Sequence, residues 1–170
     1  MAEITLRDMT RDDLDRVMEI ETASFPSPWP REDMEYEITC NAAARYYVLE
    51  EDGAVQAYAG VWFLLGEGHV TSVAVHPEAR GKGFGEKIVE HMMRKAAEMG
   101  IVFLSLEVRE NNLAAQKLYR KLGFKRAGIR EGYYDDTGED AIVMICMNPE
   151  TALRRLENKR ELERLTKKDV

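Results

Sequence analysis

The chain has 170 residues, about the length of one globular domain. Its 45% hydrophobic and 32% charged residues exclude a disordered polypeptide. The formal net charge is -7 at pH 7, so we expect no direct nucleic-acid binding, and such an acidic surface favours a basic partner. No apolar run approaches the ~20 residues of a membrane-spanning helix, and the N-terminus lacks the apolar core of a signal peptide. We therefore expect a cytoplasmic protein that does not contact membranes.

The two cysteines, Cys40 and Cys146, lie far apart and have neither a Cys-x-x-Cys partner nor a nearby pair of histidines. This spacing indicates neither a zinc site nor a disulfide framework, and we expect two buried thiols. His69, His76 and His91 also lack the spacing of metal ligands. We therefore predict no metal site and assign the histidines no catalytic role.

The order of the structural elements follows from apolar spacing and turn residues. Short apolar runs bounded by Gly, Pro or Asp-Gly predict strands, and apolar residues three or four positions apart predict helices. In chain order these are a strand at 4–6, helices beginning near 14 and 30, strands at 46–50, 55–65 and 69–75, a helix that ends at Gly100, a strand at 102–108, a helix at 113–122, and strands at 124–130 and 141–147. This order predicts a mixed α/β sheet with helices on its faces.

The C-terminal segment 149–170 differs from the rest of the chain. It carries seven Lys or Arg against five Asp or Glu, a net of +2, and it is rich in helix formers. At ~100° per residue, Leu153 and Leu156 share one helix face, while Leu162 and Leu165 point to another side. We expect a docked helical turn or two followed by a loose end, with a partner-binding helix as the alternative.

A glycine-rich turn follows the apolar strand that ends at residue 75. It consists of Arg80, Gly81, Lys82, Gly83, Phe84 and Gly85, and Glu86 comes next at the start of a helix. Glycines let backbone N–H groups approach an anion, and a helix N-terminus favours a phosphate. The turn lacks the Gly-Lys-Ser/Thr ending of a Walker loop and the spacing of a Rossmann fingerprint. By itself the pattern leaves open both a phosphate site and a simple β-to-α turn.

The turn resembles motif A of the GNAT acetyltransferase superfamily, Arg/Gln-x-x-Gly-x-Gly/Ala. Further segments occur in the order found in the RimI type, the ribosomal-protein-alanine N-acetyltransferases: 68–77, 106–112, 114–119, 122–124, 132–134 and 138–141. The resemblance runs from about residue 1 to residue 148, is dense from residue 68 onward, and has no counterpart for the tail. It implies a GNAT domain at 1–148, followed by the charged segment 149–170.

The resemblance also implies a donor substrate, acetyl-CoA. In the family, a bulged strand equivalent to Val73, Ala74 and Val75 pairs its backbone with the pantetheine arm, and a backbone N–H can hold the thioester oxygen as negative charge develops. The glycine turn takes the pyrophosphate. Asn112 hydrogen-bonds the cofactor by the same match.

Two residues receive catalytic roles. From the sequence alone Glu107 is better explained as a surface residue of its strand, and Tyr119 as a core aromatic beside Leu118 and Leu122. The resemblance reverses both interpretations. It makes Glu107 the general base for an α-ammonium group of pKa ~8, and Tyr119 the general acid for a thiolate whose thiol has a pKa of ~8.5. It implies direct attack by the amine, without a covalent enzyme intermediate.

The acceptor site is predicted from aromatic residues. By resemblance, Tyr133 and Tyr134 form one wall of a peptide groove, and Phe25 and Trp29 form the other. Glu21 is explained equally well by the substrate entrance and by an exposed helix position. Arg109 is expected to pair with nearby carboxylates in a structural role.

The predicted function is acetyl transfer to the α-amine of a protein N-terminus, with an N-terminal alanine of a ribosomal protein as the preferred acceptor by resemblance. Two alternatives remain. One is a GNAT enzyme for a small amine such as a polyamine or an aminoglycoside, which the tyrosine-bearing hairpin disfavours. The other is a CoA-binding or docking protein without turnover, which the retention of Glu107 and Tyr119 disfavours.

Overall fold

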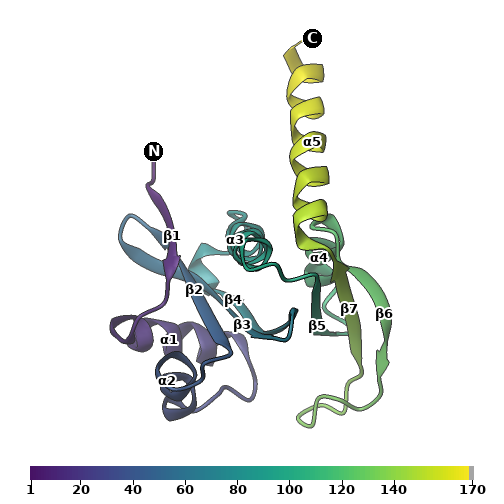
Figure 1. The fold of residues 1–170 in the computed structure, drawn as a ribbon. Helices are drawn as coiled ribbons and strands as arrows, with labels where there is room; N and C mark the ends of the chain where they lie inside the picture. The colour runs from purple at the N-terminus through teal and green to yellow at the C-terminus, as the bar shows by residue number, and fades with distance from the viewer. Residues whose placement is uncertain (169–170) are drawn as a thin grey trace.

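A computed structural model describes residues 1–168 as a sheet flanked by helices (Figure 1). The elements are, in chain order, β1 (Ile4–Asp8), α1 (Leu14–Ser24), α2 (Arg31–Thr39), β2 (Ala44–Glu51), β3 (Ala54–Leu64), β4 (Glu67–Val75), α3 (Phe84–Glu98), β5 (Phe103–Arg109), α4 (Leu113–Lys121), β6 (Lys125–Arg130), β7 (Ala141–Met147) and α5 (Pro149–Lys168). The predicted order of strands and helices through residue 147 is confirmed, and so is the mixed α/β class.

The seven strands form one sheet in the order β1-β2-β3-β4-β5-β7-β6. All neighbours are antiparallel except β4 and β5, which run parallel and pair only from Glu67 to His69 with Phe103 to Ser105. Beyond His69 the two strands separate, and Figure 1 shows β4 and β5 belonging to two diverging halves of the sheet. The separation leaves an open wedge between the C-terminal parts of β4 and β5.

The two faces of the sheet have separate apolar cores. Helix α3 packs an apolar face against one side. This face consists of Ile88, Val89, Met92, Met93 and Ala96, all of them buried. Helices α1 and α2 cover the other side, where Val17, Ile20 and Met34 meet Tyr58 and Ala74. Because the cores hold β4 from both sides, its backbone direction at the wedge is fixed by packing.

The prediction for the tail was wrong in its extent. Helix α5 continues to Lys168 and projects beyond the sheet (Figure 1). Leu153 and Leu156 are buried as predicted, whereas Leu162 and Leu165 are exposed. Arg160 Nη1 lies 2.7 Å from Glu90 Oε1 on α3. The part of α5 that contacts the rest of the protein therefore extends past its second turn. Residues 169 and 170 lie outside the described part of the chain.

The prediction of two buried thiols holds for Cys146 only. Cys146 is buried on β7, and burial raises the pKa of its thiol to about 11. Cys40 is exposed, because it caps the C-terminus of α2 rather than lying on an apolar face. Within residues 1–168, no helix is both long enough and apolar enough to cross a membrane.

Candidate active site

Strand β4 presents a free backbone edge to the wedge. Val73, Ala74 and Val75 pair with β3 on one side, while pairing with β5 has already ended at His69. The bulge expected in this strand is present but lies slightly earlier, at Thr71, because Gly60 pairs with Ser72 and Val61 with Val70. An unpaired edge of this kind can bind an extended amide-containing chain as an added strand.

The glycine turn has the geometry of an anion site. Gly81 and Gly83 adopt left-handed φ values of +83° and +81°, and a Cβ at either position would meet no atom within 4 Å. Gly83 caps α3, whose first backbone bond runs from Lys87 N to Gly83 O. The preceding N–H groups of the first turn therefore have no partner inside the helix. Open space and unpaired donors fit the pyrophosphate of CoA.

The side chains around the turn have mostly structural contacts. Arg80 Nε donates to Val75 O at 3.2 Å, and Lys82 lies 2.9 Å from Glu51. The carboxylate of Glu86 is held by Lys121 of α4 and Arg160 of α5. The Cβ of a residue at Gly85 would lie 3.3 Å from Leu118, so this glycine permits close packing of α3 on α4. The groups of the turn that are left free to meet an anion are therefore mainly backbone N–H groups.

Glu107 faces the wedge as a paired carboxylate. Its side chain is only 9% exposed, so the surface interpretation from the sequence alone is wrong. His69 Nε2 lies 2.6 Å from Glu107 Oε2, and Arg130 Nε lies 3.4 Å from Oε1. The hydrogen bond with His69, helped by the charge of Arg130, lowers the pKa of Glu107. Glu107 is therefore ionised at neutral pH and can accept a proton.

His69 was missed by the sequence analysis as part of the site. The search for metal-ligand spacing could not find it, because its contact with Glu107 crosses between two strands. Among residues 1–168, no three or more His, Cys, Asp or Glu side chains are grouped to hold a metal ion.

Tyr119 and Asn112 come from α4, beside the wedge. The Tyr119 ring is buried against Phe124, with centroids 5.7 Å apart, and burial raises the pKa of its hydroxyl. This hydroxyl makes no hydrogen bond with any residue of 1–168 and stays protonated at neutral pH. Asn112 caps α4 by accepting from Ala115 N at 3.1 Å. Its amide nitrogen makes no hydrogen bond within the same residues, so a donor is left for a ligand.

The wall between α1 and α2 is held by a buried carboxylate. Glu21 is 1% exposed, accepts a hydrogen bond from the Tyr58 hydroxyl, and accepts another from Trp29 N at 3.1 Å. Burial raises the pKa of Glu21. The exposed-helix explanation for Glu21 is therefore wrong. Of the two predicted wall residues, Phe25 packs against the core beneath α1, whereas Trp29 lines a pocket.

The opposite wall is the hairpin between β6 and β7. Tyr133 and Tyr134 pack edge to face with centroids 5.1 Å apart. Arg109 lies over the Tyr134 ring and 2.8 Å from Asp136, which confirms the structural role predicted for it. Burial raises the pKa of Tyr134 to about 12. Burial, and to a smaller extent the negative charge of Glu107, raises the pKa of Tyr133.

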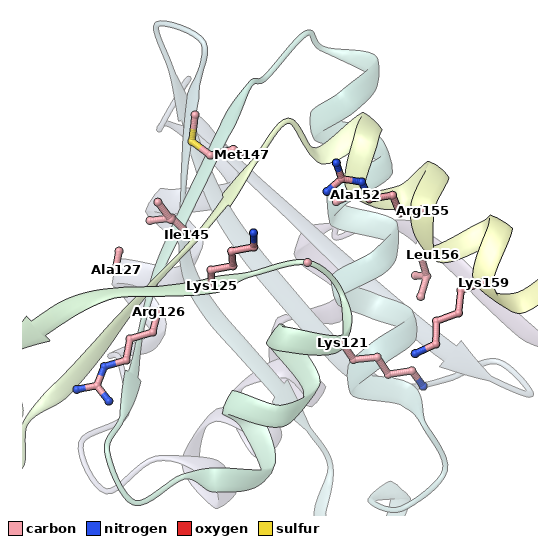
Figure 2. A pocket seen from close by; sticks show the side chains of 11 residues that line it. Lys121, Lys125, Arg126, Ala127, Ile145, Met147, Ala152, Arg155, Leu156 and Lys159 are labelled. Atoms are coloured by element: carbon pink, nitrogen blue, oxygen red, sulfur yellow. The ribbon is translucent and has the colours of Figure 1, made fainter.

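Two hollows on the described surface are compared with the predicted site. The larger, about 450 Å³, lies between β6, β7 and α5, where Figure 2 shows Lys125, Arg155 and Lys159 around it. None of the predicted site residues lines it. The smaller, about 240 Å³, lies between α2 and β3 and includes Trp29. The wedge itself is an open edge rather than an enclosed cavity.

Comparison with known proteins agrees with this geometry. The model of the acetyltransferase (GNAT) family matches residues 14–124. A relative from Bacillus subtilis (strain 168), provisionally named [ribosomal protein bS18]-alanine N-acetyltransferase, is 41% identical over 139 residues, which cover 82% of this chain and 92% of the relative. The chain belongs to the GNAT acetyltransferase family.

Similar solved structures identify the fold of this chain but not its acceptor substrate. The crystal structure of the ribosomal-protein-S18-alanine N-acetyltransferase from Escherichia coli superposes with a TM-score of 0.80 at 30% identity, covering 86% of this chain and 94% of that one. A spermidine N-acetyltransferase chimera from Vibrio cholerae and hSSAT reaches a TM-score of 0.77 at 20% identity, covering 88% of this chain and 98% of that one. The second likeness shows the fold alone, so shape does not decide between a peptide and a small amine.

Proposed function

We propose that this protein transfers acetyl from acetyl-CoA to the N-terminal α-amine of a protein, with an N-terminal alanine of a ribosomal protein as the preferred acceptor. One observation carries the proposal: a largely buried, ionised Glu107 faces the wedge between the free edge of β4 and the tyrosine hairpin. The 41% and 34% identities to relatives named for bS18 alanine acetylation support the acceptor. Such an acceptor implies a cytoplasmic location.

Each group has a chemical task in this proposal. The N–H groups of the glycine turn and the Asn112 amide hold the donor, and the edge of β4 aligns its thioester. Glu107 takes a proton from the α-ammonium group, whose pKa is ~8, and so frees the nitrogen lone pair. The nitrogen–carbon bond then forms as the carbon–sulfur bond breaks. Tyr119 gives its phenolic proton to the leaving sulfur, and the second proton lost by the new amide nitrogen restores the phenol. Residues 1–148 form the catalytic unit, and 149–170 are an appended segment.

A peptide panel tests the proposal. Peptides that differ only in their first residue are incubated with acetyl-CoA, and CoA release is measured for the wild type and for Glu107→Gln. We expect turnover of Ala-first peptides, and a fall in kcat of ~10²–10⁴-fold in the variant, the usual contribution of a general base. Thermal unfolding of Glu107→Gln is the control for folding.

The rivals predict different results from the same panel. Turnover of spermidine or an aminoglycoside without turnover of any peptide would favour a small-amine enzyme. Acetyl-CoA binding without turnover of any amine would favour a docking protein. Either result overturns the proposed acceptor.

A further inference from the structure

The smaller hollow combines aromatic rings and carboxylates. It is lined by Trp29, Asp33, Tyr36, Glu37 and Trp62. Tyr36 and Trp62 are 59% and 38% exposed, so both rings are accessible to a ligand. No Lys or Arg lines the hollow. Aromatic faces with nearby carboxylates are the surroundings that a Lys or Arg side chain prefers.

Glu37 is an incompletely paired buried carboxylate. It is only 7% exposed, and its Oε2 accepts from Trp62 Nε1 at 2.8 Å and from Asn41 Nδ2 at 2.9 Å. Its Oε1 makes no hydrogen bond with any residue of 1–168, and Asp33 forms no ion pair within the same residues. Oε1 still reaches solvent, because His91 Nε2 is the only enclosed side-chain nitrogen or oxygen without a partner in residues 1–168. The hollow therefore offers two carboxylates that are free to pair with a cationic donor.

The hollow is linked to the reacting centre across three strands. Trp62 of β3 is the register partner of His69 of β4, and their rings lie 6.3 Å apart. His69 in turn bonds Glu107 of β5 at 2.6 Å. These three side chains share the sheet face that α1 and α2 cover. An acceptor whose amine lies at Glu107 can therefore extend along this face, since an extended peptide advances ~3.3–3.6 Å per residue.

We propose that this hollow is a specificity site for a Lys or Arg side chain of the acceptor peptide, a few residues after the acetylated one. The inference rests on the proposed function and adds the acceptor's composition to it. The cation lies against the Trp62 and Tyr36 rings and is neutralised by Asp33 and the free oxygen of Glu37. A planar guanidinium suits this arrangement best, because it can stack on an indole while donating to both carboxylates.

The test uses Ala-first peptides that carry one Arg at successive positions, each paired with a twin that carries citrulline there. Citrulline keeps the shape of Arg and removes its charge. We expect one position at which the Arg peptide has a KM about tenfold lower than its twin, with similar kcat; this ratio corresponds to ~1.4 kcal/mol. Asp33→Asn and Glu37→Gln should each bring the ratio of the two KM values, citrulline twin to Arg peptide, close to one, because they raise the KM of the Arg peptide alone.

Glu32→Gln is the matched control, because Glu32 lies in the same exposed first turn of α2 and does not line the hollow. It removes the same charge as Asp33→Asn and should leave the ratio unchanged. Equal KM values for every Arg and citrulline pair would overturn the inference, as would an equal loss in Glu32→Gln. Failure of the wild type to acetylate any peptide, citrulline twins included, would instead overturn the proposed function.

Discussion

The proposed donor and acceptor sides of the wedge are built from different parts of the polypeptide. The donor side relies on backbone groups: the free edge of β4, and a helix N-terminus reached through Gly81 and Gly83. The acceptor side relies on side chains held by long-range bonds, such as Trp29 by Glu21 and Glu107 by His69. A backbone site tolerates most side-chain changes, whereas a side-chain site can change its specificity through single substitutions.

This difference separates what is shared in the family from what is particular to this chain. Every GNAT donor contains the same phosphates and pantetheine, so a backbone site serves all of them. Acceptors differ in charge and shape, and the carboxylates and rings of α2 and β3 are free to follow them. Substitutions on the donor side should therefore affect all acceptors equally, and those on the acceptor side only some.

Tyr119→Phe should produce the largest of these effects. The substitution keeps the ring packed on Phe124 and removes a hydroxyl that bonds no residue of 1–168. We expect kcat to fall by about 10²-fold, at the lower end of the range for a general acid, because a thiolate is a good leaving group. The fall should be equal for every acceptor, and the melting temperature should hardly change. A kcat like that of the wild type would assign Tyr119 to the core alone.

Gly83→Val tests the backbone nature of the phosphate site. The added Cβ enters the open space above the turn, and losing one hydrogen bond to a charged oxygen should raise the KM for acetyl-CoA by about tenfold. Gly53→Val is the matched control, since Gly53 has a φ of +84° and equally open surroundings in the β2–β3 turn. Both variants lose stability from backbone strain. An equal KM in the two would place the phosphates elsewhere.

The sequence predicted the geometry of the glycine turn well because that turn is local. The turn 80–85 is contiguous, and its glycines show directly where left-handed φ values and open space occur. The acceptor side depends on contacts between distant positions. Glu21 and Tyr58, Glu37 and Trp62, and His69 and Glu107 are 37, 25 and 38 residues apart. No periodicity within one element reveals such pairs, so His69 and the hollow were missed.

The same reasoning applies to the fold. Strand and helix order followed from local apolar spacing and turn residues, and it was confirmed. The length of α5 was not predicted, because it depends on ion pairs to a distant helix, such as that between Arg94 and Glu157. The exposure of Cys40 was also missed, since it depends on where α2 ends rather than on composition.

Glu21→Gln tests how the acceptor wall is held. Because burial raises the folded-state pKa of Glu21, its contribution to stability is fully present below the usual pKa of ~4.3 and is lost as the pH rises through the folded value. Each unit of that rise corresponds to ~1.4 kcal/mol. Gln cannot ionise, so the wild type should lose stability relative to the variant as the pH rises above ~4.3.

Urea unfolding at a series of pH values measures this difference. Glu19→Gln, at an exposed position of the same helix, should follow the wild type. A difference between wild type and Glu21→Gln that does not vary with pH would show that Glu21 titrates normally.

His69→Gln should have the smallest effect at neutral pH and a distinct one in acid. In the wild type the hydrogen bond from His69 lowers the pKa of Glu107, so the base stays ionised into acidic solution. Without His69 this pKa rises toward the usual ~4.3, which still leaves Glu107 ionised at pH 7. We therefore expect kcat/KM to change by less than about threefold at pH 7, while the acid limb of the pH profile moves to higher pH.

Arg130→Gln removes the weaker partner of Glu107, at 3.4 Å, and should move the acid limb less. An acid limb that stays at the same pH in His69→Gln would show that the low pKa of Glu107 has another source. The acceptor side would then depend less on paired side chains than the geometry indicates.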